Sequence, residues 1–343
     1  MDTAAEQAAG DAQDWDFPRS VTGAFILARF AATRGVSLTR VLRGSGIGPR
    51  DLADPDTLVE AHQELAIIRN LLAALGDPPG LGVEAGAHYH LTAYGIWGFT
   101  LISSATMREA LRVGGRFREL TFAFSQVRVR TDGLRLRLLL SGQTVPPGVR
   151  RFTTERDCAA LLAMHRELFG VEGVPLHQVR FAGAPPSSDE PYRAFFQVPV
   201  AFGADVTELV YDAELLDRRL PQANEHTAAI CAEQCRRLLT ERRRRAAGGT
   251  ARAIRERLLR QNGVDGGIEA TAAALHTTSR TLRRKLTAEG TSYRALTEEV
   301  RHVIADGLLH HGHTMSEIAY RLGYSEPSSF ARAYRRWTTD RTR

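Results

Sequence analysis

The chain has 343 residues, enough for two or three domains, and its 43% apolar and 24% charged residues are ordinary for a water-soluble globular protein. The net charge of +6 is unevenly placed: residues 241–343 hold 20 Arg and Lys against 11 Asp and Glu, a net +9, so residues 1–240 sum to −3. We expect a polyanion to bind at the positive end.

Several classes of protein are disfavoured at once. The chain has no run of about 18 apolar residues, so we predict no membrane contact. The N-terminus is acidic and polar as far as Asp16, which matches neither a signal peptide nor an anchor. The cysteines, Cys158, Cys231 and Cys235, suit a reducing cytoplasm, and we predict buried thiols rather than a redox switch or a metal site.

The first part of the chain is mostly helical in pattern. Residues 1–16 are predicted to be disordered. The apolar residues that follow are spaced as in helices, and Phe25, Leu27 and Phe30 are candidate core positions. Residues 76–80 are a strong signal for the end of a helix. The predicted helices are residues 21–34, 36–42, 58–75 and 106–120.

Strand patterns appear next. Residues 122–130 and 134–140 alternate, and Thr131-Asp-Gly133 between them predicts a β-hairpin with an Asp-Gly turn. A helix over residues 153–169 and a short one over 192–196 then alternate with further strands. Those strands are residues 176–181, 200–202 and 208–211. This order favours one α+β domain.

The segment that follows separates two domains. Residues 225–239 read as a helix, and Glu241-Arg-Arg-Arg-Arg245 with the glycines at 248 and 249 indicate a linker over residues 241–249. The arginine run is either a solvated hinge or a contact for phosphate. The predicted domains are therefore residues 17–240 and 250–343.

Two helix-turn-helix patterns lie in the second domain, over residues 268–286 and 315–337, joined by a helical pattern over residues 293–309. In the second helix of each, apolar residues fall on one face: Leu282 and Leu286 in the first, and Phe330, Tyr334 and Trp337 in the second. The opposite faces carry the polar residues predicted to contact DNA. These are Thr277, Arg280, Thr281, Arg283, Arg284, Lys285, Ser328, Ser329, Arg332, Arg335 and Arg336.

The spacing of these residues resembles the DNA-binding domain of the AraC/XylS family of bacterial transcription regulators. The matching residues are Leu282, Arg284, Leu286, Gly290, Ile318-Ala319, Leu322-Gly-Tyr-Ser325, Ser328, Phe330, Arg332, Tyr334 and Arg335-Arg-Trp337. The resemblance implies double-stranded DNA and RNA polymerase as partners. After Trp337 the chain departs from the family pattern, in which a last short helix closes the domain.

The first domain is similar to the arabinose-binding type of N-terminal domain found in one branch of that family. The matching segments are Gly46-Ile47, Asp54-Pro55, Gly76-Asp-Pro78, Gly80-Leu-Gly82, Gly95-Ile-Trp-Gly98, residues 104–111 and Pro199-Val-Ala-Phe202. The resemblance implies a small-molecule effector of unknown identity and a homodimer. Aromatic and histidine residues near the middle of the domain are the candidate effector contacts: His88, Tyr89, His90, Tyr94 and Trp97.

The prediction is an α+β N-terminal effector-binding domain plus an all-α C-terminal domain with two helix-turn-helix units, in a sequence-specific regulator. No catalytic residue, metal ligand set or cofactor motif is predicted. Two other classes compete: an enzyme or ligand carrier with a basic tail that binds nucleic acid without sequence preference, and a structural nucleoid protein. The first predicts turnover by residues 1–240 or DNA affinity that is indifferent to sequence, and the second predicts dense non-specific coating of DNA and no effector.

Overall fold

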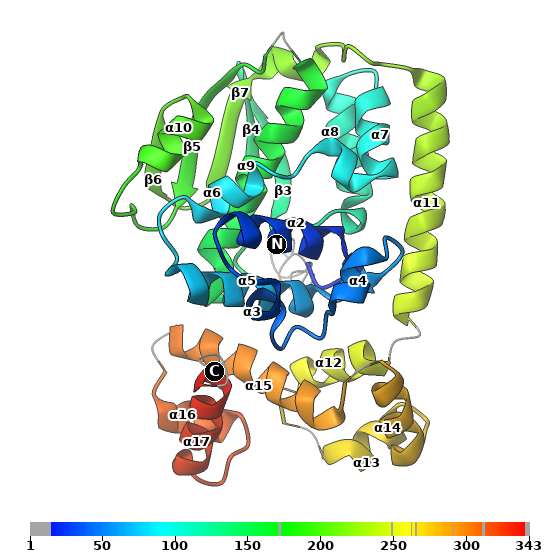
Figure 1. Cartoon of the computed structure of the whole chain (residues 1–343), viewed down its shortest axis with the longest axis vertical. Helices are drawn as coiled ribbons and strands as arrows, with labels where there is room; N and C mark the ends of the chain where they lie inside the picture. Colours follow the sequence, from blue (N-terminus) through cyan, green and yellow to red (C-terminus); the bar gives the residue numbers. More distant parts are fainter. Residues whose placement is uncertain are drawn as a thin grey trace, which may run out of the picture. The chain divides into compact units, whose positions relative to one another are not determined.

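The computed structural model describes residues 15–170, 173–247, 250–261, 263–264, 266–289, 291–310 and 313–339 (Figure 1). The described residues divide into two compact units at Glu241/Arg242. The α+β and all-α classes predicted for the two parts of the chain are confirmed. Most of the predicted disordered segment, and the end of the chain after Thr339, lie outside the described residues. Trp15, the first described residue, is buried against Phe124, so the folded part begins within the segment predicted to be disordered.

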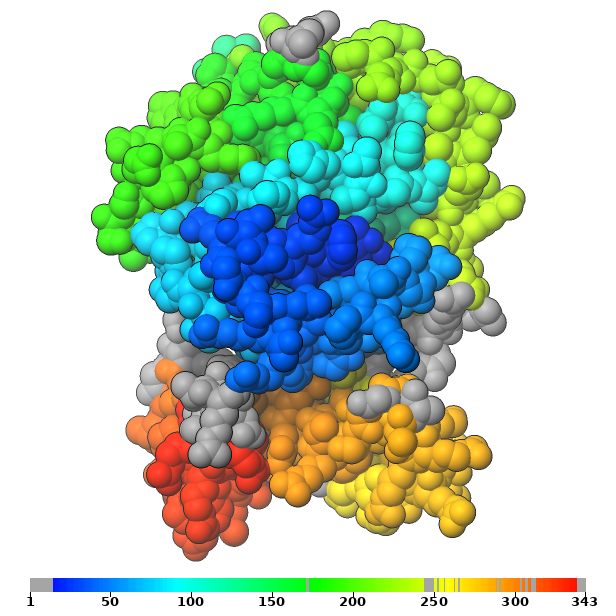
Figure 2. Space-filling view, in the orientation of Figure 1, coloured from blue at the N-terminus to red at the C-terminus, as the bar shows by residue number. Residues whose placement is uncertain are grey.

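The first unit starts with a layer of helices, drawn in blue in Figure 1 and seen as a continuous blue band in Figure 2. Within α2 Leu27 and Phe30 are buried as predicted, but Phe25 is 40% exposed, because the buried stripe runs through Ala24, Leu27 and Ala31. The elements of this layer are β1 (Arg19–Ser20), α2 (Thr22–Thr33), α3 (Leu38–Leu42), α4 (Pro49–Ala53), β2 (Leu58–Val59) and α5 (Ala61–Leu75).

A five-stranded sheet in the order β3-β4-β7-β5-β6 forms the second half of this unit, antiparallel except for the parallel pair β5 and β6. The predicted hairpin is present, but its two-residue turn is Gly133-Leu134, one residue later than expected. The first strand begins at Gln126 rather than Phe122. The strands are β3 (Gln126–Asp132), β4 (Arg135–Ser141), β5 (Leu176–Ala182), β6 (Val200–Ala204) and β7 (Thr207–Asp212).

Helix α9 (Pro147–Phe169) packs on one face of the sheet (Figure 1), where its Leu162 joins Leu138 and Leu209 in the core. Helix α6 (Leu81–Gly86) crosses α9 closely at two glycines. A Cβ at Gly82 or Gly86 would lie 2.4 Å from a backbone oxygen of α9, so only glycine permits this crossing.

The remaining elements of the first unit are η1 (Leu91–Tyr94), α7 (Ile96–Ser103), α8 (Met107–Arg116), η2 (Arg118–Leu120), α10 (Glu190–Phe196), η4 (Ala213–Asp217) and α11 (Glu225–Ala247) as far as Glu241, after which α11 belongs to the second unit. Helix α11 continues through the arginine run into the segment predicted as linker, because Arg and Ala are good helix formers. The exact domain boundaries remain predictions.

The second unit consists of six helices in its described residues: α12 (Thr250–Arg260), α13 (Gly267–Ala274), α14 (Ser279–Ala288), α15 (Tyr293–His310), α16 (Met315–Arg321) and α17 (Pro327–Thr339). Helix α15 is shared between two small cores. Its Leu296 and Val300 pack with α12, α13 and α14, whereas its Ala305 packs with α16 and α17. In neither unit does a described helix have the length and apolar character needed to cross a bilayer.

Candidate nucleic-acid interface and ligand cavity

The two helix-turn-helix units make the same turn although their sequences differ. His276 in the first and Gly323 in the second adopt positive φ angles of 51° and 75°. In both, the next residue donates its backbone N–H to the alanine carbonyl five residues earlier, which satisfies the end of the first helix. These bonds are Thr277 N to Ala272 O and Tyr324 N to Ala319 O, each 2.9 Å.

Each turn leads directly into an arginine-bearing helix. Thr278 caps α14 by accepting the N–H of Thr281 at 3.2 Å. The connection between the two helices is one residue longer in the second helix-turn-helix unit (residues 322–326) than in the first (residues 275–278). Residues 48 apart therefore occupy matching positions on the two second helices, and Arg284 corresponds to Arg332.

One face of each second helix is buried and the other is open. Leu282 and Leu286 are 1% exposed, and Phe330 and Trp337 are buried in the second core, as their periodicity predicted, while Tyr334 is half-buried against it. The predicted DNA contacts lie away from these residues. Thr277, Thr281 and Ser329 are half-buried, and Arg280, Arg283, Arg284, Lys285, Ser328, Arg332, Arg335 and Arg336 are exposed.

The exposed cations differ in how they are engaged. Arg336 donates to Glu298 of α15 at 2.9 Å, and Arg283 lies 3.7 Å from Glu269. In the parts of the chain that the structure describes, Arg284 and Lys285 form no ion pair, so their charges are available to a polyanion.

A short connection ties the first helix-turn-helix unit to the turn of the second. Arg301 of α15 donates to the carbonyl oxygen of Gly263 at 2.8 Å and lies over the ring of Tyr324. Val264 packs against Gly323, where an added Cβ would lie 3.1 Å from both of its methyl carbons. The turn of the second helix-turn-helix unit therefore contacts the loop that precedes the first helix-turn-helix unit.

The N-terminal compact unit contains a cavity beside the sheet. Its empty space is about 920 Å³ when the open mouth is included. Its walls come from α7, α8, the extended segment of residues 121–129 and α9. Val127 and Val129 are exposed in this wall, whereas Leu101 and Met107 are buried. The enclosed part of the cavity is about 130 Å³, close to the size of an apolar cavity that holds one small molecule.

Two of the five predicted effector residues, Tyr94 and Trp97, line this cavity, with their ring centroids 5.0 Å apart. The other three do not. Tyr89 is buried behind the wall against Phe122, and burial raises the pKa of its hydroxyl. His88 and His90 are exposed on the surface: His88 packs on Phe30, and the Nδ1 of His90 contacts Glu167.

The cavity wall also contains polar groups that the sequence did not single out. Ser125 is 2% exposed, and its Oγ has no hydrogen-bond partner in the described residues. His165, also 2% exposed, shares a hydrogen bond between its Nδ1 and the hydroxyl of Tyr211, and burial lowers its pKa to about 3, so its ring is neutral. Nothing in the local sequence marks these residues, because the wall is assembled from distant segments.

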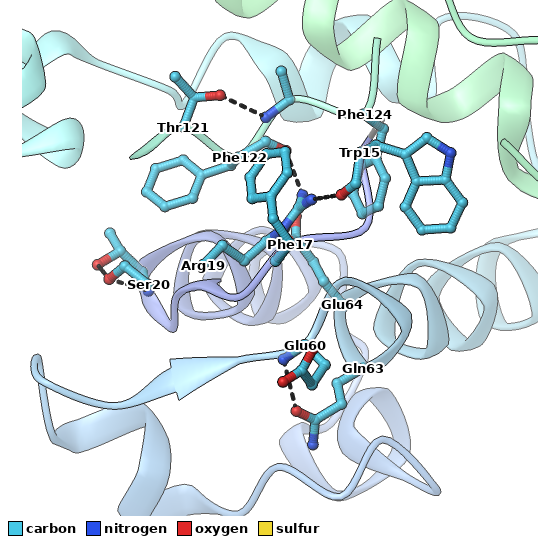
Figure 3. Close-up of polar contacts among 12 residues, drawn as sticks. Trp15, Phe17, Arg19, Ser20, Glu60, Gln63, Glu64, Thr121, Phe122 and Phe124 are labelled. Atoms are coloured by element: carbon cyan, nitrogen blue, oxygen red, sulfur yellow. Dashed lines mark hydrogen bonds and ion pairs between the residues drawn. The ribbon is translucent and has the colours of Figure 1, made fainter. Parts of the chain in front are cut away.

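A buried cluster of charges supports the same wall. Arg19 and Arg156, both at most 1% exposed, each form an ion pair with Glu64, and Arg156 also pairs with Asp157. Both arginines donate to the carbonyl oxygen of Phe122, at 3.0 and 2.7 Å (Figure 3 shows the Arg19 bond). The only signal in the sequence was the charged triplet at residues 155–157 inside an otherwise buried helix.

No group of three or more His, Cys, Asp or Glu side chains that could hold a metal ion is found in the portion of the chain described.

Comparison with known protein families gives two matches. Residues 35–220 match the family described as the arabinose-binding domain of AraC transcription regulator, N-terminal, and residues 271–341 match a helix-turn-helix domain. The first match covers more than half of the chain.

Relatives match over nearly the full length. An HTH-type transcriptional regulator of Mycobacterium tuberculosis is 35% identical over 317 residues, 91% of each chain. The ornithine utilization regulator of Pseudomonas aeruginosa is 30% identical over 90% of each chain. Among solved structures, the transcriptional regulator CdpR of Pseudomonas aeruginosa matches with 26% identity and a TM-score of 0.48, over 93% of this chain and 95% of that one.

Proposed function

Because this chain belongs to the AraC family of DNA-binding transcription regulators, with an N-terminal effector domain, we propose that α14 and α17 are its two recognition helices. The observation that carries this assignment is the repeated turn, which presents Arg284 and Arg332 at matching positions on two exposed helix faces. Helix α15 joins the two helix-turn-helix units. This arrangement suits insertion of α14 and α17 into successive major-groove segments on one side of a duplex.

We assign different roles to the exposed residues of these helices. Arg280, Arg284 and Arg332 read base edges, with Thr277, Thr281, Ser328 and Ser329 beside them. Arg283, Lys285, Arg335 and Arg336 contact phosphates. Because Glu298 already holds Arg336, its phosphate contact requires that ion pair to be exchanged, and we expect it to contribute least.

Genome-wide recovery of DNA by the purified chain at physiological salt is the test of sequence-specific binding. We expect a few fragments that share two half-motifs about one helical turn apart. Uniform recovery would mean that the basic unit binds electrostatically, as a nucleoid protein or a carrier with a basic tail would.

The neighbouring residues Arg284 and Lys285 provide a matched pair for the roles of single side chains. Arg284→Ala should cost about 1–3 kcal/mol on a recovered fragment and much less on scrambled DNA. Lys285→Ala should weaken binding to both DNAs alike and make it less dependent on salt. Equal losses for Arg284→Ala on the two DNAs would contradict base reading.

For the first unit, we propose that the effector binds in the cavity lined by Tyr94 and Trp97, rather than at the surface histidines His88 and His90. The cavity is concave and largely apolar, whereas the histidines lie outside it. An effector then regulates transcription by binding one state of the protein more tightly than another.

We also propose a homodimer in the cytoplasm that contacts RNA polymerase, as the family resemblance implies. Sedimentation of the full chain with and without a recovered DNA fragment tests the dimer, which a single monomeric species at all concentrations would contradict.

A further inference from the structure

The wall of the cavity is dominated by carbon. Leu101, Met107, Met164 and Leu168 contribute aliphatic side chains, and Tyr94 and Trp97 contribute aromatic faces. A sugar carries a hydroxyl on nearly every carbon, and each buried hydroxyl needs a hydrogen-bond partner. A wall of this composition leaves most of those hydroxyls unsatisfied, so it disfavours a sugar.

One polar group in the wall nevertheless lacks a partner. The Oγ of Ser125 is buried without a hydrogen bond in the described residues. Its side chain is 2% exposed and lines the cavity. Unsatisfied buried polar groups are costly, and a ligand that hydrogen-bonds them removes that cost.

The charges around the cavity exclude an ammonium group at this polar end. Asp157 is the one carboxylate among the described lining residues, and both of its oxygens are occupied. Its Oδ1 accepts from Arg156 at 2.8 and 3.1 Å, and its Oδ2 accepts the backbone N–H groups of Phe124 and Ser125 at 2.9 and 2.7 Å. The cationic lining residue, Arg118, is half-exposed and is already engaged in an interaction of its own.

We propose that the effector is an uncharged, hydrocarbon-rich molecule with a single hydroxyl or carbonyl group, which binds Ser125 in the cavity. This inference rests on the proposed function, since it names the ligand class of the cavity assigned above. It separates this chain from a regulator that senses a sugar or a diamino acid.

The first experiment compares head groups at constant chain length on the full chain. N-Phenyl-1-naphthylamine, a neutral apolar fluorophore, serves as the bound probe, and 1-octanol, octanoate, octylammonium and L-arabinose serve as competitors. We expect 1-octanol to displace the probe at least about tenfold more effectively than either octyl ion, because a buried charge without a partner is strongly disfavoured. Displacement by L-arabinose, or tighter binding of an ion than of the alcohol, would overturn the proposal.

Two variants locate the ligand. At Gly114 of α8 a Cβ would sit 3.4 Å from Trp97 and 3.5 Å from Leu101, in ordinary contact, so Gly114→Met fills the cavity without a backbone clash. Gly148→Met is the matched control, because Gly148 is an exposed helical glycine with open space around it. We expect Gly114→Met to abolish binding of the fluorophore, and with it displacement by octanol, and Gly148→Met to leave both unchanged; the reverse, or equal effects, would refute the location.

The role of Ser125 is tested with Ser125→Ala and a second competitor, 1-chlorooctane, which has the same chain but no hydroxyl. We expect the affinity for octanol to fall about fivefold and that for chlorooctane to stay the same, since one neutral hydrogen bond is lost. Equal losses would show that Ser125 only shapes the wall and would contradict its role as head-group contact.

The proposal on the ligand class and the proposal on DNA binding can fail independently. A chain that recovers specific fragments but binds no octyl alcohol refutes the ligand class alone. A chain that binds octanol in the cavity but recovers DNA uniformly refutes base reading alone.

Discussion

A buried glutamate makes the stability of the first unit depend on pH near neutrality. Glu155 of α9 is 3% exposed; the Tyr192 hydroxyl donates to its Oε1, and the Gly82 N–H donates to its Oε2 at 3.2 Å. Burial raises the pKa of this carboxyl from 4.5 to about 7, although both hydrogen bonds and the charge of Arg151 act in the opposite direction.

The direction of the effect follows from proton linkage. Between pH 4.5 and about 7 the folded chain keeps a proton on Glu155 that the unfolded chain has released. The contribution of this group is therefore fully present below pH 4.5 and is lost as the pH rises through 7. At about 1.4 kcal/mol per pH unit, the full loss is about 3 kcal/mol, of which about 2.5 kcal/mol falls between pH 5 and 8.

Glu155→Gln removes the titration while keeping a group of the same shape. The amide oxygen can accept from Gly82 and its nitrogen can donate to the hydroxyl of Tyr192. His165 has the opposite linkage: its pKa is lowered by burial, so its contribution is lost as the pH falls below 6.5. The test is therefore the difference between parent and variant at each pH, in which the His165 contribution cancels.

Urea unfolding followed by tryptophan fluorescence measures this difference. The chain has three tryptophans, and Trp337→Phe in both proteins leaves Trp15 and Trp97 to report on the first unit alone. We expect the stability of parent minus variant to fall by about 2.5 kcal/mol between pH 5 and 8. Glu214→Gln, at an exposed carboxylate, is the control and should leave the profile unchanged. Parallel profiles for parent and Glu155→Gln would refute the reasoning.

Two further predictions concern single positions. Arg156→Leu should destabilise the first unit by about 3–5 kcal/mol in the same urea assay, because it leaves buried carboxylates uncompensated, and a loss below 1 kcal/mol would contradict this. Gly323→Val should destabilise the C-terminal compact unit by at least about 2 kcal/mol, because the φ angle of Gly323 is +75° and the added Cβ would press on Val264. At the matching turn, His276→Gly should be neutral or slightly stabilising. Calorimetry of the full chain compares the two turn variants. Similar losses of stability for both would show that the two turns do not have the same requirement for a positive φ angle.

The helix-turn-helix units could be predicted from the sequence because their determinants are local. The periodicity of Leu282 and Leu286, and of Phe330 and Trp337, gave the buried faces correctly. Gly323 marked its turn through the positive φ angle that glycine permits. The matching turn at His276 carries no such mark, since a histidine in that conformation is not evident from residue type.

The sheet was predicted less well at its edges. Phe122 and Phe124 alternate as in a strand, yet the ladder begins only at Gln126. Alternation signals that successive side chains point to opposite sides, and residues 121–125 do so without a strand partner. Thr121, Ala123 and Ser125 line the cavity, whereas Phe122 and Phe124 pack with the aromatic cores behind it.

This difference explains why the first unit buries two arginines. Replacing buried ion pairs by apolar residues is often neutral or stabilising, so stability alone does not account for them. A buried extended segment outside a sheet must satisfy its backbone groups by other means. Here the arginines bind the carbonyl oxygen of Phe122, and Asp157 accepts the N–H groups of Phe124 and Ser125. The charges thus replace the missing strand and hold Ser125 at the cavity, an arrangement that depends on three segments far apart in the chain and that no local pattern could indicate.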